Sequence, residues 1–192
     1  MCAEKWNQFF STQFYYGMRL LILIVFLMIS SLGKAQSPTD AALCFYNWYL
    51  QAIKGPAKAH TAIVKKSPTG ETVLDYEQYF HNLDSLGCVS DSFKISEKLR
   101  FQICQDHFQD VPFVEYYENI DNNPFFYEQP CPFFTKYHWV GDIEYWSIGS
   151  VEQVSGIDQA TVNLTLKGGT KQRVWRVITV RTDEHWRIVK IE

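Results

Sequence analysis

The sequence has no internal repeat, no low-complexity tract and no motif that specifies a reaction. It lacks both a glycine-rich phosphate-binding loop and the Gly-x-Ser-x-Gly turn of serine hydrolases. Neither C-x-x-C nor H-x-x-x-H spacing occurs, so we expect no zinc site and no cofactor. The chain also lacks an excess of basic residues, with 18 Lys and Arg against 21 Asp and Glu. A mildly acidic chain suits nucleic-acid phosphates poorly, and no nucleic-acid partner is expected.

The N-terminus carries the clearest pattern in the chain. Residues 20–28 are all strongly apolar, Arg19 precedes them, and small residues follow. A basic flank, a short apolar core and small residues before a cut are typical of a secretory signal peptide. Gly33 and Ala35 fit the small positions of a cleavage site, so we predict cleavage after Ala35. Met18 is an alternative start residue.

Cleavage would leave one domain of ordinary size, which is long enough to bury a core. The alternative is an uncleaved membrane anchor, although the apolar run is shorter than the roughly 20 residues that a spanning helix needs. We expect an exported protein, periplasmic or extracellular, without membrane association after cleavage. The expected division is a signal peptide over 1–35 and a single α+β domain over 36–192.

Four cysteines follow the leader: Cys44, Cys88, Cys104 and Cys131. An even number in an exported chain predicts two disulfides, for which three pairings exist. We favour Cys88–Cys104 with Cys44–Cys131, because the first pair closes a short loop worth about 3 kcal/mol. Buried free thiols are the alternative, since cysteine packs well in cores.

Apolar residues at three- and four-residue steps predict helices in the first half. The first helix is expected over 41–53, with Thr39 or Asp40 as its cap. A second is expected over 74–86, and a third from Ser90 or Ser92 to about His107. In the third helix, the recurring apolar residues are Ile95, Leu99 and Ile103.

The second half of the sequence shows patterns of loop and strand in place of helix. Residues 109–137 contain four prolines and many aromatics, which predicts a long structured loop. Alternating apolar residues then predict strands. Helices followed by antiparallel strands indicate an α+β domain of N-terminal helices packed on a sheet of about four strands. The expected strands are 139–154, 158–166, 172–181 and 185–191.

Three segments carry a resemblance to a known fold. Residues 45–50 read Phe-Tyr-Asn-Trp-Tyr-Leu, residues 121–129 contain Asn-Pro-Phe-Phe and end in Gln, and residues 186–191 read Trp-Arg-Ile-Val-Lys-Ile. Together they resemble an exported bacterial family of unknown function with a nuclear-transport-factor-2-like, or cystatin-like, α+β fold. The resemblance implies a cone in which a curved antiparallel sheet wraps a long helix. It implies no reaction, because such cones serve as isomerases, dehydratases, adaptors and scaffolds.

One group of residues offers weak candidates for catalysis. His138, Asp142 and Glu144 lie at the entrance to the first long strand. A carboxylate beside an imidazole can perform general acid–base chemistry near neutral pH. The alternative is a solvated strand end with two ordinary surface acids.

A second group offers candidates for binding: Glu115, Tyr116, Tyr117, Asp121 and Tyr127. Their mixture of acids and aromatics could line a ligand mouth or a protein contact. The alternative is that the aromatic rings of this loop fill the core.

We therefore expect an exported ligand- or protein-binding module, of inhibitor or immunity type, with a protein partner or a small apolar ligand. The first alternative is a small enzyme of the isomerase or dehydratase kind. The second is a scaffold that forms a homodimer.

Overall fold

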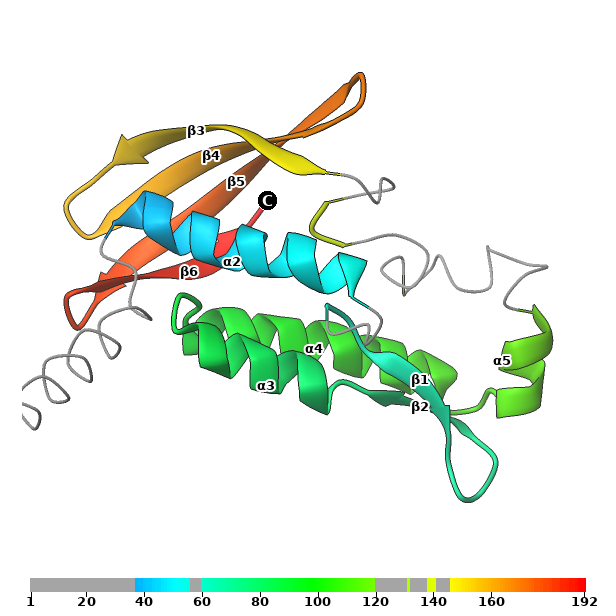
Figure 1. The fold of residues 1–192 in the computed structure, drawn as a ribbon. Coiled ribbons are helices and arrows are strands. Elements are labelled where there is room, and N and C mark those ends of the chain that lie inside the picture. Colours follow the sequence, from blue (N-terminus) through cyan, green and yellow to red (C-terminus); the bar gives the residue numbers. More distant parts are fainter. Residues whose placement is uncertain (1–36, 56–59, 120–130, 132–137, 141–145) are drawn as a thin grey trace, which may run out of the picture. The chain divides into compact units, whose positions relative to one another are not determined.

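The computed structural model describes residues 37–55, 60–119, 131, 138–140 and 146–192 of the chain. The chain divides into two units after Lys34, and every described residue belongs to the second unit, Ala35–Glu192. The predicted leader lies outside the described residues. The second unit is an α+β domain with helices and a four-stranded antiparallel sheet, as the sequence predicts (Figure 1).

Helix α2, Pro38–Lys54, begins earlier than the predicted Ala41. Ser37 is its cap, because the Ser37 hydroxyl accepts a hydrogen bond from the Asp40 N–H at 3.1 Å. Pro38 fits the first turn, where a helix leaves the backbone N–H without a partner anyway. The cap is therefore Ser37 rather than Thr39 or Asp40.

A small hairpin separates α2 from the next helix. Strand β1, Ile63–Lys66, pairs antiparallel with strand β2, Thr72–Asp75. Leu74 was predicted to start a helix but lies in β2, where its N–H donates to Gln105 Oε1 at 2.7 Å. Helix α3 is consequently shorter than predicted and spans Glu77–Leu86.

Helix α4, Asp91–Phe108, starts after Ser90, whose hydroxyl accepts from the Phe93 N–H at 3.1 Å. The apolar residues that the sequence singled out do not face the core. Ile95, Leu99 and Ile103 are 60%, 61% and 58% exposed. A second set at helical spacing is buried instead, because its rings bury more apolar surface than aliphatic chains do. This buried set is Phe93, Glu97, Phe101, Cys104 and Phe108.

In the described part of the predicted 109–137 loop, residues 109–119 and 131, the chain forms a helix that the sequence analysis missed. Helix α5, Phe113–Asn119, is a short helix that follows Pro112. The Tyr116 N–H donates to the Pro112 carbonyl at 3.0 Å. Proline is well suited to this place, since its fixed φ favours the start of a helix.

The sheet has the order β3-β4-β5-β6, and neighbours are antiparallel. Positive φ angles at Gly169, and at Asp183 and Glu184, form the turns after β4 and β5. The first strand starts later than predicted, at Ser147 rather than Trp139. The two outer strands do not pair, so the sheet is open. The strands are β3 Ser147–Ser155, β4 Gln159–Gly168, β5 Lys171–Thr182 and β6 His185–Ile191.

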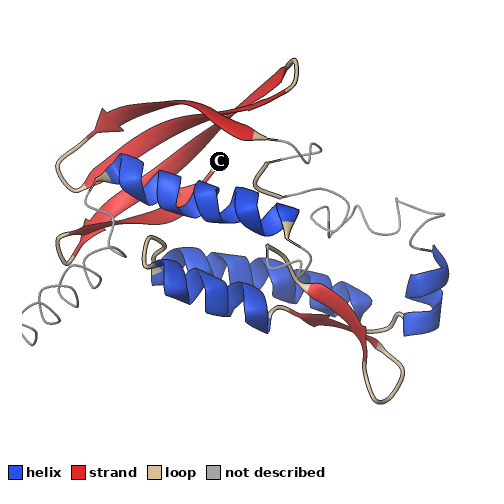
Figure 2. Ribbon diagram, viewed as in Figure 1, coloured by secondary structure: helices blue, strands red, loops and turns tan. Residues whose placement is uncertain are grey.

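Helix α2 lies between the sheet and the helices α3 and α4 (Figure 2). It contacts all four strands, and Phe45, Tyr46 and Tyr49 on this helix are buried. On its other side, the Phe45 ring lies 5.7 Å from the Phe93 ring of α4. The Trp48 ring likewise lies 6.0 Å from the Tyr79 ring of α3. The helix that the sequence placed against the sheet is thus confirmed there.

Two disulfides form, and both differ from the favoured pairing. Cys44 bonds to Cys88, and Cys104 bonds to Cys131, with Cα–Cα distances of 6.4 and 5.5 Å. The predicted Cys88–Cys104 bond is wrong because α4 lies between these residues. Thirteen residues of helix rise by about 20 Å, which far exceeds the reach of a disulfide. The predicted Cys44–Cys131 bond is wrong as well.

Candidate functional site

The predicted catalytic group is only partly described. His138 lies in a turn before the sheet, whereas Asp142 and Glu144 lie outside the described residues. The His138 ring is half-buried and lies 4.2 Å from the Trp139 ring. Burial, together with the positive charges of Arg100 and Arg173, lowers the pKa of His138 to about 3. This imidazole is therefore neutral, and a weak base, at physiological pH.

A buried carboxylate lies deeper in the domain. Glu97 of α4 is 3% exposed and accepts a hydrogen bond from the Tyr79 hydroxyl at 2.5 Å. Arg100 also donates to Glu97, from Nε at 3.0 Å and from its terminal nitrogen. Burial and the Glu97 charge raise the pKa of Tyr79 well above its usual value, so this hydroxyl stays protonated and donates. The carboxylate oxygens are thus engaged in holding α3 to α4.

Aromatic rings surround this network. The Arg100 guanidinium lies 5.8 Å from the Trp139 ring, and Trp139 lies 6.1 Å from Trp175 of β5. Within the part of the chain that the structure describes, several buried donors have no hydrogen-bond acceptor. An indole N–H can only donate, so such groups would suit an oxygen-rich ligand or water. They are the Trp139, Trp146 and Trp175 indoles and the Tyr46 hydroxyl.

The predicted binding residues on α5 differ in exposure. Tyr116 is buried, with its ring 5.5 Å from that of Phe108. Tyr117 is 70% exposed, and Glu115 is exposed as well. Asp121 and Tyr127 lie outside the described residues.

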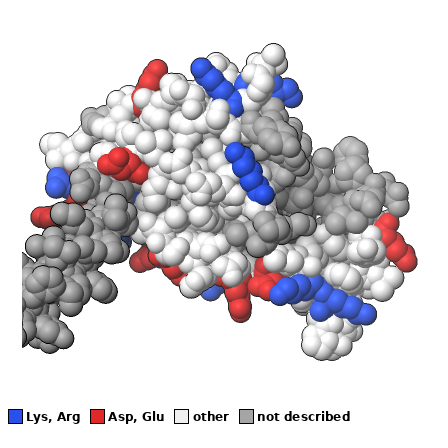
Figure 3. Space-filling view, in the orientation of Figure 1, with Lys and Arg blue, Asp and Glu red and all other residues white. Residues whose placement is uncertain are grey.

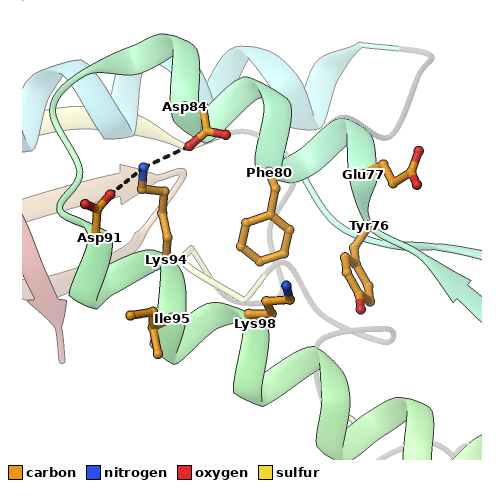
Figure 4. Close-up of a pocket in the computed structure, with 8 residues that line it drawn as sticks. All are labelled: Tyr76, Glu77, Phe80, Asp84, Asp91, Lys94, Ile95 and Lys98. Carbon is orange, nitrogen blue, oxygen red and sulfur yellow. Dashed lines mark hydrogen bonds and ion pairs between the residues drawn. The ribbon is translucent and has the colours of Figure 1, made fainter.

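A groove of about 410 Å³ runs between α3 and α4 (Figure 4). Phe80 and Tyr76 point into it from α3 and the residue before that helix, and Ile95 lies opposite on α4. At one end, Lys94 bonds both Asp84 and Asp91 at 2.8 Å. These two carboxylates raise the pKa of Lys94, so it stays charged and closes that end. Lys98 and Glu77 complete the lining.

Ile95 joins the groove to the exposed residues of α4, because Leu99 and Ile103 follow it at four-residue steps along the same helix. We call this surface the α3–α4 face and define it as Tyr76, Phe80, Ile95, Leu99 and Ile103. Sequence reasoning missed this surface because it used the aliphatic residues only as the apolar repeat that indicates a helix. The sequence did offer a signal for the correct buried side of α4, because Phe93, Phe101 and Phe108 form a second apolar set at helical spacing.

The charge of the domain is unevenly distributed. From Glu77 to Glu118, which spans α3 to α5, the chain has eight acidic and three basic side chains. From Trp146 to Glu192, which spans the sheet, it has five acidic and seven basic ones. Figure 3 shows acidic side chains along the lower border of the view, over the region of α3 and α4. The α3–α4 face is therefore set in acidic surroundings.

The described residues contain no cluster of three or more side chains that could hold a metal ion. Among the helices that the structure describes, none is long and apolar enough to cross a membrane. Comparison with protein-family models, with curated proteins and with solved structures gives no match to this chain.

Proposed function

We propose that this chain is an exported protein-binding module, of inhibitor or immunity type, which docks its partner on the α3–α4 face. One observation carries the proposal: Ile95, Leu99 and Ile103 form an exposed aliphatic row on a helix whose other side is fully packed. Scattered exposed aliphatic residues are ordinary, but contiguous ones beside a groove are typical of interaction sites.

The row is large enough to matter energetically. Burying an aliphatic side chain contributes about 1.5–3 kcal/mol. Three side chains that are each about 60% exposed would therefore contribute roughly 3–5 kcal/mol when a partner covers them. That amount is comparable with the central anchors of known interfaces.

Export is part of the proposal and rests on two features. The first 35 residues have the pattern of a signal peptide, and the two disulfides suit an oxidising compartment. We also propose the cone of the nuclear-transport-factor-2-like, or cystatin-like, fold as the architecture. The position of α2 across all four strands supports that proposal.

Site-directed photo-crosslinking tests the proposed function. A photoreactive phenylalanine analogue replaces Leu99 in the full chain, produced in its native host, and Ile157 serves as the control because it is 87% exposed on the β3–β4 turn. We expect one defined adduct from position 99 and none from position 157. Equal labelling from both positions, or no adduct from position 99, would contradict a docking role. An adduct with a second copy would instead support the homodimeric scaffold.

A small-ligand site is a second candidate, supported by the buried donors of Trp139, Trp146, Trp175 and Tyr46. A ligand that accepts hydrogen bonds from them would shift the indole N–H signals in an NMR spectrum. Trp186 of β6 is the control, because its side chain is only half-buried and its indole does not belong to this set of buried donors. An enzyme of the isomerase or dehydratase kind is less well supported, because His138 with a pKa of about 3 is a weak general base.

A further inference from the structure

We infer that the partner is a basic protein that lays an amphipathic α-helix along the α3–α4 face and inserts an aliphatic side chain into the groove beside Phe80. This inference rests on the proposed function and adds the chemistry of the partner to it.

Two basic side chains of α4 already have carboxylate partners within the domain. Arg100 pairs with the buried Glu97, and Lys94 is shared between Asp84 and Asp91. Lys98 is then the one Lys or Arg side chain on α3, α4 and α5 for which no ion pair forms among the described residues. Exposed carboxylates outnumber it, and opposite charge on a partner would speed and orient its approach. These carboxylates are Glu77, Asp106 and Asp110.

The same charges disfavour other occupants. If a second copy docked its own α3–α4 face on this one, the exposed carboxylates of the two copies would lie close together, and their repulsion would cost free energy. An anionic membrane surface would be repelled for the same reason. A basic protein surface is the occupant that the charges favour.

The geometry argues for a helix. Ile95, Leu99 and Ile103 span nine residues of α4, a rise of about 12 Å. A partner helix of about three turns matches that length, and its side chains at i, i+4 and i+7 can interdigitate with the row. The groove beside the row is flanked by two helices and has Phe80 and Tyr76 at its floor. An aliphatic side chain from the third helix would fill that space.

Two synthetic peptides provide the test. Both have 14 residues with leucines at i, i+4, i+7 and i+11, and the other positions are Lys and Gln in one and Glu and Gln in the other. Binding to the full mature domain is measured by calorimetry and by amide NMR shifts. We expect the basic peptide to bind at least tenfold more tightly, with the largest shifts at Ile95, Leu99 and Ile103. Raising the salt concentration from 50 to 300 mM should weaken it severalfold.

Variants separate docking from non-specific attraction. Leu99→Asn keeps the charge and should weaken the basic peptide at least fivefold, whereas the matched control Val154→Asn, at a 67% exposed position of β3, should leave it unchanged. Thermal unfolding of both variants checks that the fold is intact. Equal affinity for the acidic and basic peptides would overturn the inference. An affinity for the basic peptide that is the same in Leu99→Asn as in the native protein would overturn it too.

The outcomes also distinguish this inference from the proposed function. If the cross-link from position 99 captures a partner whose contact surface is acidic or not helical, the inference fails and the proposed function stands. If position 99 gives no adduct and neither peptide binds, both fail.

Discussion

Replacing Glu97 tests how the domain keeps its helical layer together. Glu97→Leu removes the acceptor for both Tyr79 and Arg100, each of which donates to the carboxylate. Breaking a buried ion pair costs about 3–5 kcal/mol, and the lower end applies here because the Arg100 side chain is 21% exposed and can turn toward water. The buried Tyr79 hydroxyl adds about 1 kcal/mol. We therefore expect Glu97→Leu to lower the free energy of unfolding by about 4 kcal/mol.

Removing the whole network is the matched control. In the triple variant Glu97→Leu, Arg100→Met and Tyr79→Phe, the carboxylate and both of its described donors are removed together, and apolar packing replaces the ion pair. We expect this variant to lie within about 1.5 kcal/mol of the native protein. Urea unfolding at pH 7 with both disulfides intact measures the free energies, and an unchanged denaturant dependence confirms the comparison. A loss below about 1 kcal/mol in the single variant, or a triple variant as unstable as the single one, would refute the reasoning.

Three further predictions concern pH, packing and the disulfides. The lowered pKa of His138 means that the unfolded chain takes up the proton first, so stability is full above about pH 6.5 and falls toward pH 3, by up to about 1.4 kcal/mol per unit; His138→Phe should flatten urea-unfolding stabilities in that window relative to the native protein. Leu83→Ala, at a fully buried residue, should cost about 2–5 kcal/mol in the same assay, whereas Leu99→Ser should change stability by about 0.5 kcal/mol or less. Replacing Cys44 and Cys88 with alanine should lower the free energy of unfolding by about 4 kcal/mol. A non-reducing peptide map of the native protein should recover Cys44 joined to Cys88, and recovery of Cys88 joined to Cys104 would contradict the fold.

The strands were the part of the fold that the sequence predicted best. Ala160, Val162, Leu164 and Leu166 alternate with polar residues, and all four are buried on one side of β4. Alternation is a local property that depends on one buried face, so it can be read without knowing the neighbours.

The errors arose where a distant contact decided between two local possibilities. Leu74 fits a helix by its spacing, but its pairing with Val64 places it in a strand. Helix α4 offers two apolar sets, and only the rings of α2 and α3 decide that Phe93 and Phe101 face inward. Sequence spacing could not rank these sets, and the α3–α4 face was missed as a result.

Some features of the candidate site can be predicted from the sequence, and others depend on contacts between distant residues. The acidic excess between Glu77 and Glu118 can be counted directly in the sequence. The groove cannot, because Phe80 and Ile95 come together only when α3 and α4 lie side by side. His138 was named from the sequence, but the two arginines that lower its pKa lie on α4 and β5.

The disulfides also determine how a mechanical load would travel through the domain. Cys88 precedes α4 and is bonded to Cys44 of α2, while Cys104 near the other end of α4 is bonded to Cys131. A partner that pulls on Leu99 would therefore apply force to a helix that is held by a disulfide near each of its ends. Separating the start of α4 from α2 would require rupture of the Cys44–Cys88 bond. Oxidised protein should consequently withstand far greater pulling forces than reduced protein in a single-molecule stretching measurement.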